Sequence, residues 1–150
     1  MKFFRINNMF RLGNWCYNDT VRPCLSKLEN YDDVVLSNTK DYYSPLLVSE
    51  ASLLGFFDSW EKESSKRTFS RNDCTISVIH HPTHYSILIE TPRGRLEKVV
   101  LFLNEVQNLW YFMTGYELDI SPKYNILCEV PEIADIIERM PRSTNNKSQE

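Results

Sequence analysis

The hydrophobic positions from Leu103 to Met113 repeat at the spacing of an α-helix. With about 100° of rotation per residue, one arc collects most of the large apolar side chains, namely Leu103, Val106, Leu109, Trp110 and Met113. Tyr111 and Phe112 fall on the opposite side, beside Asn108. The pattern therefore predicts a helix over residues 104–114 that packs on a core through one face and carries aromatic side chains on the other.

The two ends of this helix have their own signals. Asn104 is placed to cap the first turn, with Gln107 three residues later completing a capping box. Gly115 is placed to adopt the left-handed conformation that closes a last turn. The apolar residues 118–120 that follow predict an edge strand.

An antiparallel meander is predicted before the helix. Its strands cover residues 74–79, 85–90 and 96–101, which are rich in β-branched or alternating apolar residues. Turns at Pro82 and at residues 92–94 separate them. Because the helix follows the third strand directly, we expect it to fold back across this three-stranded sheet.

The first third of the chain predicts a small curled sheet. Two strands flank a polar turn at Asn18 and Asp19, and residues 33–36 predict a third short strand before residues 42–45 interrupt the sheet. Short strands joined by tight turns are typical of an SH3-like half barrel, which we predict for residues 10–41.

The segment between the two sheets predicts little regular structure. Ser49 begins a predicted short helix that Gly55 ends. Residues 60–73 are polar with mixed charge, which predicts a solvated loop with Phe69 as its anchor.

The pattern as a whole predicts an α+β fold. We expect one strand-rich domain over residues 1–141, in which residues 74–120 form the meander and its crossing helix. Pro131 stands at the first position of a predicted amphipathic helix over residues 131–140, and residues 142–150 predict a disordered tail. A chain of 150 residues suffices for one core, whereas two independent domains would need more.

Composition and charge narrow the function classes. The hydrophobic fraction of 42% is that of a globular protein, and the net charge of −3 argues against a general grip on a nucleic acid backbone. We find no apolar run of signal-peptide or membrane-spanning length. The expected place is therefore the cytoplasm, with no membrane contact.

Four widely spaced cysteines without a CxxC pair predict reduced thiols, although a disulfide between Cys16 and Cys24 across two paired strands stays an alternative. His80, His81 and His84 surround Pro82 and raise the hypothesis of a zinc site with Cys74. Their spacing matches no known ligand pattern, so we favour a turn with surface histidines and a buried Cys74. The chain has no glycine-rich phosphate loop and no nucleophile motif, and we expect neither a cofactor nor enzymatic activity.

Two sets of residues are candidates for binding. Lys66, Arg67, Arg93 and Arg95 belong to a basic set around Phe69 and the second turn of the meander, which is the alternative hypothesis of a nucleic acid surface. Acidic neighbours dilute that set, so nucleic acid is not the expected partner. The favoured set is Asn108, Tyr111 and Phe112, which either bind another protein, a second copy included, or are covered by the chain's own segments.

Three blocks of the chain carry a resemblance. They read FRLGNWCY near the start, YSPLLVSEASLLGFF in the middle and EVQNLWYFMTGYELDI near the end. In this order they resemble a group of small uncharacterised proteins of Bacteroidota phages and mobile elements, whose blocks read LRIGNWV, PLTEEWLLKFGF and LQNLYFALTGEEL. The matching residues are Leu12 to Trp15, Leu54 to Phe56, Gln107 to Leu109, Phe112, Thr114, Gly115, Glu117 and Leu118.

The resemblance implies a phage or mobile-element origin. It transfers no activity to any residue, and this chain has Asn104 and Glu105 where the group usually has a histidine before the helix. We therefore expect a small non-enzymatic interaction protein, such as a virion component or a protein that binds a host factor. A nucleic-acid-binding accessory protein is the first alternative, and an immunity or inhibitor protein that blocks a toxin or defence enzyme is the second.

Overall fold

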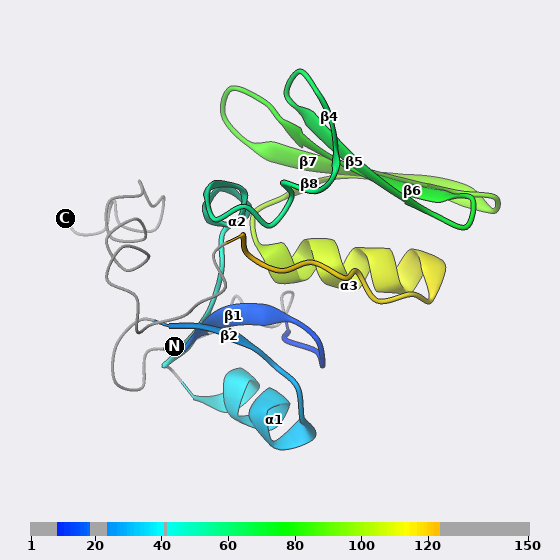
Figure 1. Ribbon diagram of the computed structural model, residues 1–150. Helices are drawn as coiled ribbons and strands as arrows, with labels where there is room; N and C mark the ends of the chain where they lie inside the picture. The colour runs from blue at the N-terminus through cyan, green and yellow to red at the C-terminus, as the bar shows by residue number, and fades with distance from the viewer. Residues whose placement is uncertain (1–8, 19–23, 41, 124–150) are drawn as a thin grey trace.

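The chain folds into two antiparallel sheets with a helix between them (Figure 1). The computed structural model describes residues 9–18, 24–40 and 42–123. Helix α3 (Leu103–Thr114) lies under the larger sheet and above the smaller one, and helix α1 (Tyr31–Thr39) covers the far side of the smaller sheet. The α+β prediction is confirmed, while the helix predicted over residues 131–140 and the tail over 142–150 lie outside the described residues.

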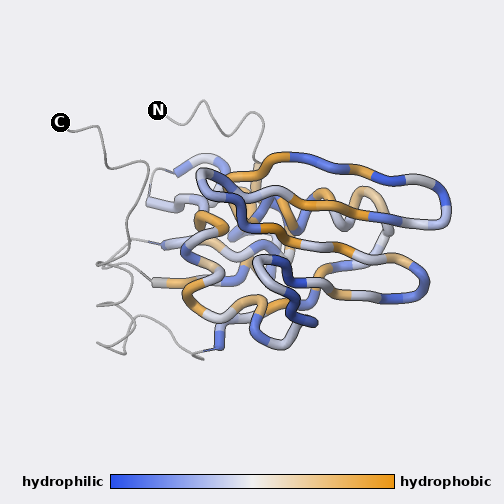
Figure 2. Tube along the Cα trace, turned by 90° about the horizontal axis from the view of Figure 1, so that it is seen from above, coloured by the Kyte–Doolittle hydropathy of each residue, from blue (hydrophilic) through white to orange (hydrophobic). Residues whose placement is uncertain are grey.

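The larger sheet has five strands in the order of the chain. They are β4 (Glu61–Glu63), β5 (Lys66–Arg71), β6 (Cys74–His80), β7 (Tyr85–Thr91) and β8 (Gly94–Val100). The last three confirm the predicted meander. Figure 2 shows hydrophobic residues along the strands and hydrophilic residues at the hairpin turns.

The solvated loop predicted for residues 60–73 is wrong, because these residues form β4 and β5. Lys66 to Arg71 pair with β6 along their whole length. Asn72 and Asp73 make the two-residue turn, with positive φ of 48° and 65°, which suits the right-handed twist of a hairpin. The charged residues on these strands hid the strand pattern, but Phe69 is an anchor as predicted, since it stacks on Trp60 with 5.6 Å between ring centroids.

The smaller sheet has the strand order β2-β1-β3. The two predicted strands are confirmed as β1 (Trp15–Asn18) and β2 (Cys24–Lys27). In this register Cys16 lies opposite Ser26, and Cys24 lies opposite Asn18, so the two cysteines are not cross-strand partners.

The third strand of the smaller sheet was predicted in the wrong place. Residues 33–36 lie in helix α1, because Asn30 accepts a hydrogen bond from the Asp33 amide at 2.9 Å and caps the first turn. The strand is instead β3 (Tyr43–Pro45), in the segment expected to interrupt the sheet. Burial raises the pKa of the Tyr43 hydroxyl above its ordinary value, with a smaller contribution from the charge of Asp33.

Helix α2 (Val48–Leu53) links the sheets, and Gly55 ends it with φ of 84°, as predicted. The strand before α2 and the segment before α3 lie together, since the Val48 amide donates to the Leu101 carbonyl at 2.9 Å and the Leu103 amide to the Leu46 carbonyl at 2.7 Å. Both helices therefore start from one joined pair of segments, which fixes their relative position.

The main core lies between the larger sheet and α3. The register places Phe69, Ile76, Ile89 and Leu96 in one row across four strands, on the face that meets the helix. Val106 and Trp110 of α3 are fully buried against this side, whereas Leu109 and Met113 are half-buried. A second cluster under α1 holds Phe10, Cys16, Leu28 and Tyr43.

The start of α3 differs from the prediction. Its N-cap is Phe102, and the Glu105 carboxylate accepts the amides of Leu101 and Phe102 at 2.8 and 3.0 Å. Asn104 and Gln107, the predicted capping pair, are buried inside the molecule. The chain after α3 contains no strand between residues 118 and 120, so the predicted edge strand is wrong, but Leu118 and Ile120 are buried in the main core.

Gly115 ends α3 in the left-handed conformation, with φ of 78° and its amide bonded to the Tyr111 carbonyl at 2.8 Å. Changing Gly115 to Val should lower the free energy of unfolding by about 1 to 2 kcal/mol, because side chains resist this conformation. Urea unfolding measures the loss. Gly94→Val is the control, since Gly94 has no positive φ and a Cβ there meets no atom within 4 Å. Equal losses for the two variants would contradict the assignment of the cost to the backbone.

No helix among the described residues combines the length and the apolar character needed to cross a membrane.

Candidate functional site

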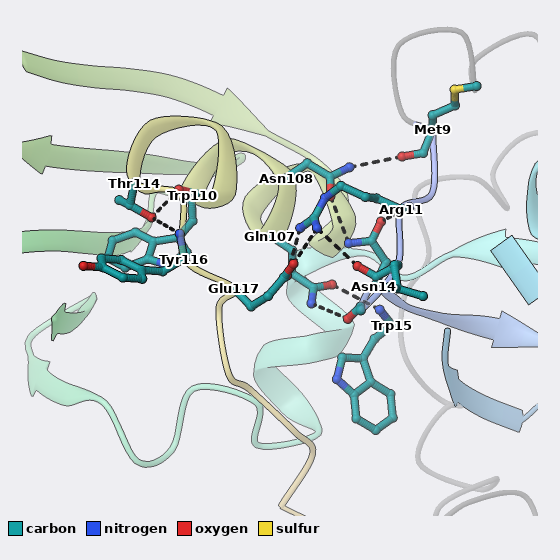
Figure 3. A network of polar contacts seen from close by, with 12 residues as sticks. Met9, Arg11, Asn14, Trp15, Gln107, Asn108, Trp110, Thr114, Tyr116 and Glu117 are labelled. Carbon is teal, nitrogen blue, oxygen red and sulfur yellow. Dashed lines mark hydrogen bonds and ion pairs between the residues drawn. The ribbon is translucent and has the colours of Figure 1, made fainter. Parts of the chain in front are cut away.

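The residues of the first and third sequence blocks meet at one place in the structure (Figure 3). Gln107 donates to the Gly13 carbonyl at 3.0 Å and accepts the Trp15 amide at 3.1 Å. Because Gln107 is only 2% exposed, these bonds satisfy two backbone groups in a dry environment. The blocks that carry the resemblance thus join α3 to the start of β1.

Asn108 belongs to the same network. Its carbonyl oxygen accepts hydrogen bonds from Asn14 at 2.9 Å and from Arg11 at 3.1 Å, and its amide group donates to the Met9 carbonyl at 3.1 Å. The Arg11 guanidinium also holds the Glu117 carboxylate through two contacts of 2.7 and 3.1 Å. Asn108, predicted to bind a partner, therefore uses its polar atoms to hold the N-terminal segment on α3.

Tyr111 is covered from the same side. The Arg11 guanidinium lies 4.2 Å from the centre of the Tyr111 ring, which is the geometry of a cation–π contact. The ring is still 42% exposed. The second face of α3 is thus partly covered by residues near the N-terminus, which sequence reasoning did not name.

Phe112, in contrast to Tyr111, is almost uncovered. Its side chain is 80% exposed, the largest exposed fraction among the exposed large apolar residues of the described chain. It stands on the rim of a groove of about 460 Å³ beside the last turn of α3. The described residues leave most of this ring in water, so a partner that buries it would remove a large apolar area from water.

The groove lies where two hairpins of the larger sheet and the end of α3 come together. It is lined by the turn after β5, the start of β6, the turn between β7 and β8, and the end of α3, through Asn72, Cys74, Thr91, Pro92, Arg93 and residues 112–116. In Figure 1 the two hairpin turns and the end of α3 lie at the same end of the molecule. Its volume falls in the range of pockets that bind ligands or side chains.

The groove combines an apolar rim with positive charge. Met113 adds a flexible apolar side chain beside Phe112. Arg93 lines the opposite side with no ion-pair partner among the described residues. Nearby, the Arg71 guanidinium lies 4.1 Å from the centre of the Tyr116 ring, and Asn72 donates to the Tyr116 hydroxyl at 3.1 Å, so that this wall is held in place.

The four basic residues of the alternative hypothesis do not form one surface. Lys66 and Arg67 are neighbours on β5 and point to opposite faces of the sheet. Arg95 lies on β8, three strands or about 14 Å away, and Arg93 lies at the groove. Lys66 and Arg95 also have acidic neighbours, Glu63 at 3.9 Å and Glu97 at 3.6 Å.

The histidines bond within their own turn. The rings of His81 and His84 stack with 4.4 Å between centroids, His81 contacts the Ser86 hydroxyl at 2.7 Å, and the His80 ring stacks on Tyr85. Within residues 9–18, 24–40 and 42–123, no three His, Cys, Asp or Glu side chains gather where they could hold a metal ion. Cys74 is 7% exposed at the base of the groove, in agreement with the predicted buried thiol.

Comparison of the chain with protein-family models, with curated proteins and with solved structures finds no match.

Proposed function

We propose that this chain is a protein-interaction protein whose groove beside the end of α3 binds a segment of another protein. The observation that carries the proposal is the 80% exposure of Phe112 on the rim of a 460 Å³ groove that also contains Met113 and Arg93. Large aromatic and arginine side chains are the residue types that contribute most to interface energies. The origin in a phage or mobile element, and the role as a virion component or host-factor binder in a bacterial cytoplasm, belong to the same proposal.

The chemistry of the groove favours one kind of partner segment. The apolar rim suits a large apolar side chain, and Arg93 suits a carboxylate beside it, because a guanidinium forms paired hydrogen bonds with carboxylates. We therefore expect an extended segment with an aromatic or aliphatic residue next to Asp or Glu. Asn108 is not part of this surface, since the network of Figure 3 occupies its polar atoms.

Selection from a displayed random peptide library on the immobilised protein tests the proposal. Selected peptides should share the apolar and acidic pair. Phe112→Ser should weaken their binding at least about tenfold, the effect of removing an anchor residue worth more than 1.4 kcal/mol. Arg93→Glu should weaken it as well, because it places like charges together. Calorimetry of the selected peptides measures both effects.

Two control variants match these changes outside the groove. Leu53→Ser removes another exposed apolar side chain, 60% exposed on α2, and Arg95→Glu reverses a charge that already neighbours Glu97. Both should bind the peptides like the parent. A library that yields no shared motif, or peptides that bind Phe112→Ser unchanged, would contradict the groove.

Variants of the same residues also test the two other possible partners, a second copy of the chain and nucleic acid. Concentration-dependent dimerisation in sedimentation equilibrium that Phe112→Ser abolishes would identify a second copy of the chain as the partner. Retention on single-stranded DNA that falls with added salt, and disappears when Lys66, Arg67, Arg93 and Arg95 become Ala, would support the nucleic acid alternative instead.

A further inference from the structure

A second, smaller pocket lies at the other end of β6 from the groove. It has a volume of about 160 Å³ and is lined by Ser52, Ser64, Ser65, Arg67, Val78, His80 and Tyr85. Cys74 at the groove and His80 at this pocket are the first and last residues of β6. The groove and this pocket share no lining residue. A ligand of the pocket is therefore independent of the partner that binds the groove.

Arg67 and the three serines of this pocket have side chains without a hydrogen-bond or ion-pair partner among the described residues. Arg67 is half-buried as a residue, yet its side chain makes no ion pair or hydrogen bond with any residue that the structure describes. The hydroxyls of Ser52, Ser64 and Ser65 likewise make no hydrogen bond within residues 9–18, 24–40 and 42–123. Four residues with hydrogen-bond donors thus line one small pocket, with Ser64 and Ser65 exposed and Ser52 and Arg67 half-buried. No acceptor side chain among the described residues is paired to them, so an acceptor from outside can bind there.

The charged residues of β4 and β5 are divided between the two faces of the sheet, and those on the face with the pocket are basic. Lys62 lies opposite Arg67 in the register and therefore on the same face. Glu61 and Glu63, the acidic residues of β4, lie opposite Thr68 and Lys66, on the other face. The Glu63 carboxylate is 3.9 Å from the Lys66 ammonium there. No carboxylate lines the pocket.

We propose that this pocket binds a phosphoryl group, with Arg67 as its charged anchor and the three serine hydroxyls as further donors. A planar guanidinium and hydroxyl groups are the donors that proteins use for tetrahedral oxyanions. The volume of about 160 Å³ is large enough for a phosphoryl group. The group is either free inorganic phosphate or a monoester whose remaining part stays outside.

NMR titration of the ¹⁵N-labelled full chain tests this assignment. Sodium phosphate and methyl phosphate are added in separate series, with sodium chloride at matched ionic strength as the reference. We expect saturable shifts at the amides of Ser64 and Ser65 with phosphate and none with chloride. Tighter binding of methyl phosphate would assign an esterified phosphate, and tighter binding of phosphate would assign the free ion.

Arg67→Gln should weaken the binding at least about tenfold, which corresponds to the loss of one charge-assisted hydrogen bond. Lys66→Gln is the matched control, because it removes the same charge from the neighbouring residue on the opposite face, and it should bind like the parent. Ser52→Ala tests the site from α2 without a change in the sheet, and should also weaken binding. Shifts no larger than those with chloride, or equal losses for Arg67→Gln and Lys66→Gln, would overturn the site.

Discussion

Replacing Trp110 with Ala should lower the free energy of unfolding by about 3 to 5 kcal/mol, the cost of a large cavity in a packed core. Trp110 is fully buried, and its ring meets Phe69 of the larger sheet edge to face, with 5.9 Å between centroids. Its indole N–H makes no hydrogen bond with the described residues. The expected loss is therefore one of packing, and urea unfolding measures it.

Two variants make this expectation specific. Phe112→Ala removes an aromatic ring two positions along the same helix, but that ring is 80% exposed, so it should change stability by less than about 0.5 kcal/mol. Trp110→Phe keeps most of the ring and removes the unbonded donor, and it should cost much less than Ala. A Trp110→Ala variant as stable as Phe112→Ala would mean that α3 does not pack on the sheet in this orientation.

Replacing Gln107 with Ala should cost about 2 to 4 kcal/mol, because it leaves the Gly13 carbonyl and the Trp15 amide without their partner. The effect should be largest in the smaller sheet, whose strand β1 begins at Trp15. Hydrogen exchange of the β1 and β2 amides, together with urea unfolding, measures it.

Asn72→Gly provides the control for Gln107, because glycine keeps the left-handed backbone of Asn72, whose φ is 48°. Asn72 also makes a side-chain hydrogen bond, to the Tyr116 hydroxyl at 3.1 Å, but it is exposed and water can replace the lost bond. This variant should lose less than about 0.5 kcal/mol. If exchange in β1 stays unchanged in Gln107→Ala, then the network of Figure 3 does not hold the two parts together.

Sequence patterns predicted an element correctly where a single physical requirement determines the local structure. The helix over residues 104–114 was predicted because a single period of apolar residues runs through it, and its end at Gly115 because a left-handed residue favours glycine. The strands β6 to β8 were predicted for a similar reason, since β-branched residues alternate between short turns.

Sequence patterns predicted the wrong structure where contacts with other residues determine the conformation of a segment. Residues 66–71 carry the charges of a solvated loop, yet they form β5, because pairing with β6 satisfies the backbone and Phe69 reaches the core. Residues 33–36 have the β-branched residues of a strand, yet the Asn30 cap and the acidic first turn make them helical. In both cases a contact made by one or two residues outweighed the propensity of the segment.

The sequence by itself determined which residues belong to helix α3, which strands form the meander, and that this helix has aromatic side chains on its second face. Only the tertiary structure decided what those side chains do. Tyr111 lies under Arg11, which is 100 positions earlier in the chain, Asn108 is occupied by Asn14, and Phe112 alone stands free at the groove. Helical periodicity gives the direction of a side chain, but its exposure depends on segments distant in sequence, and no local pattern contains them.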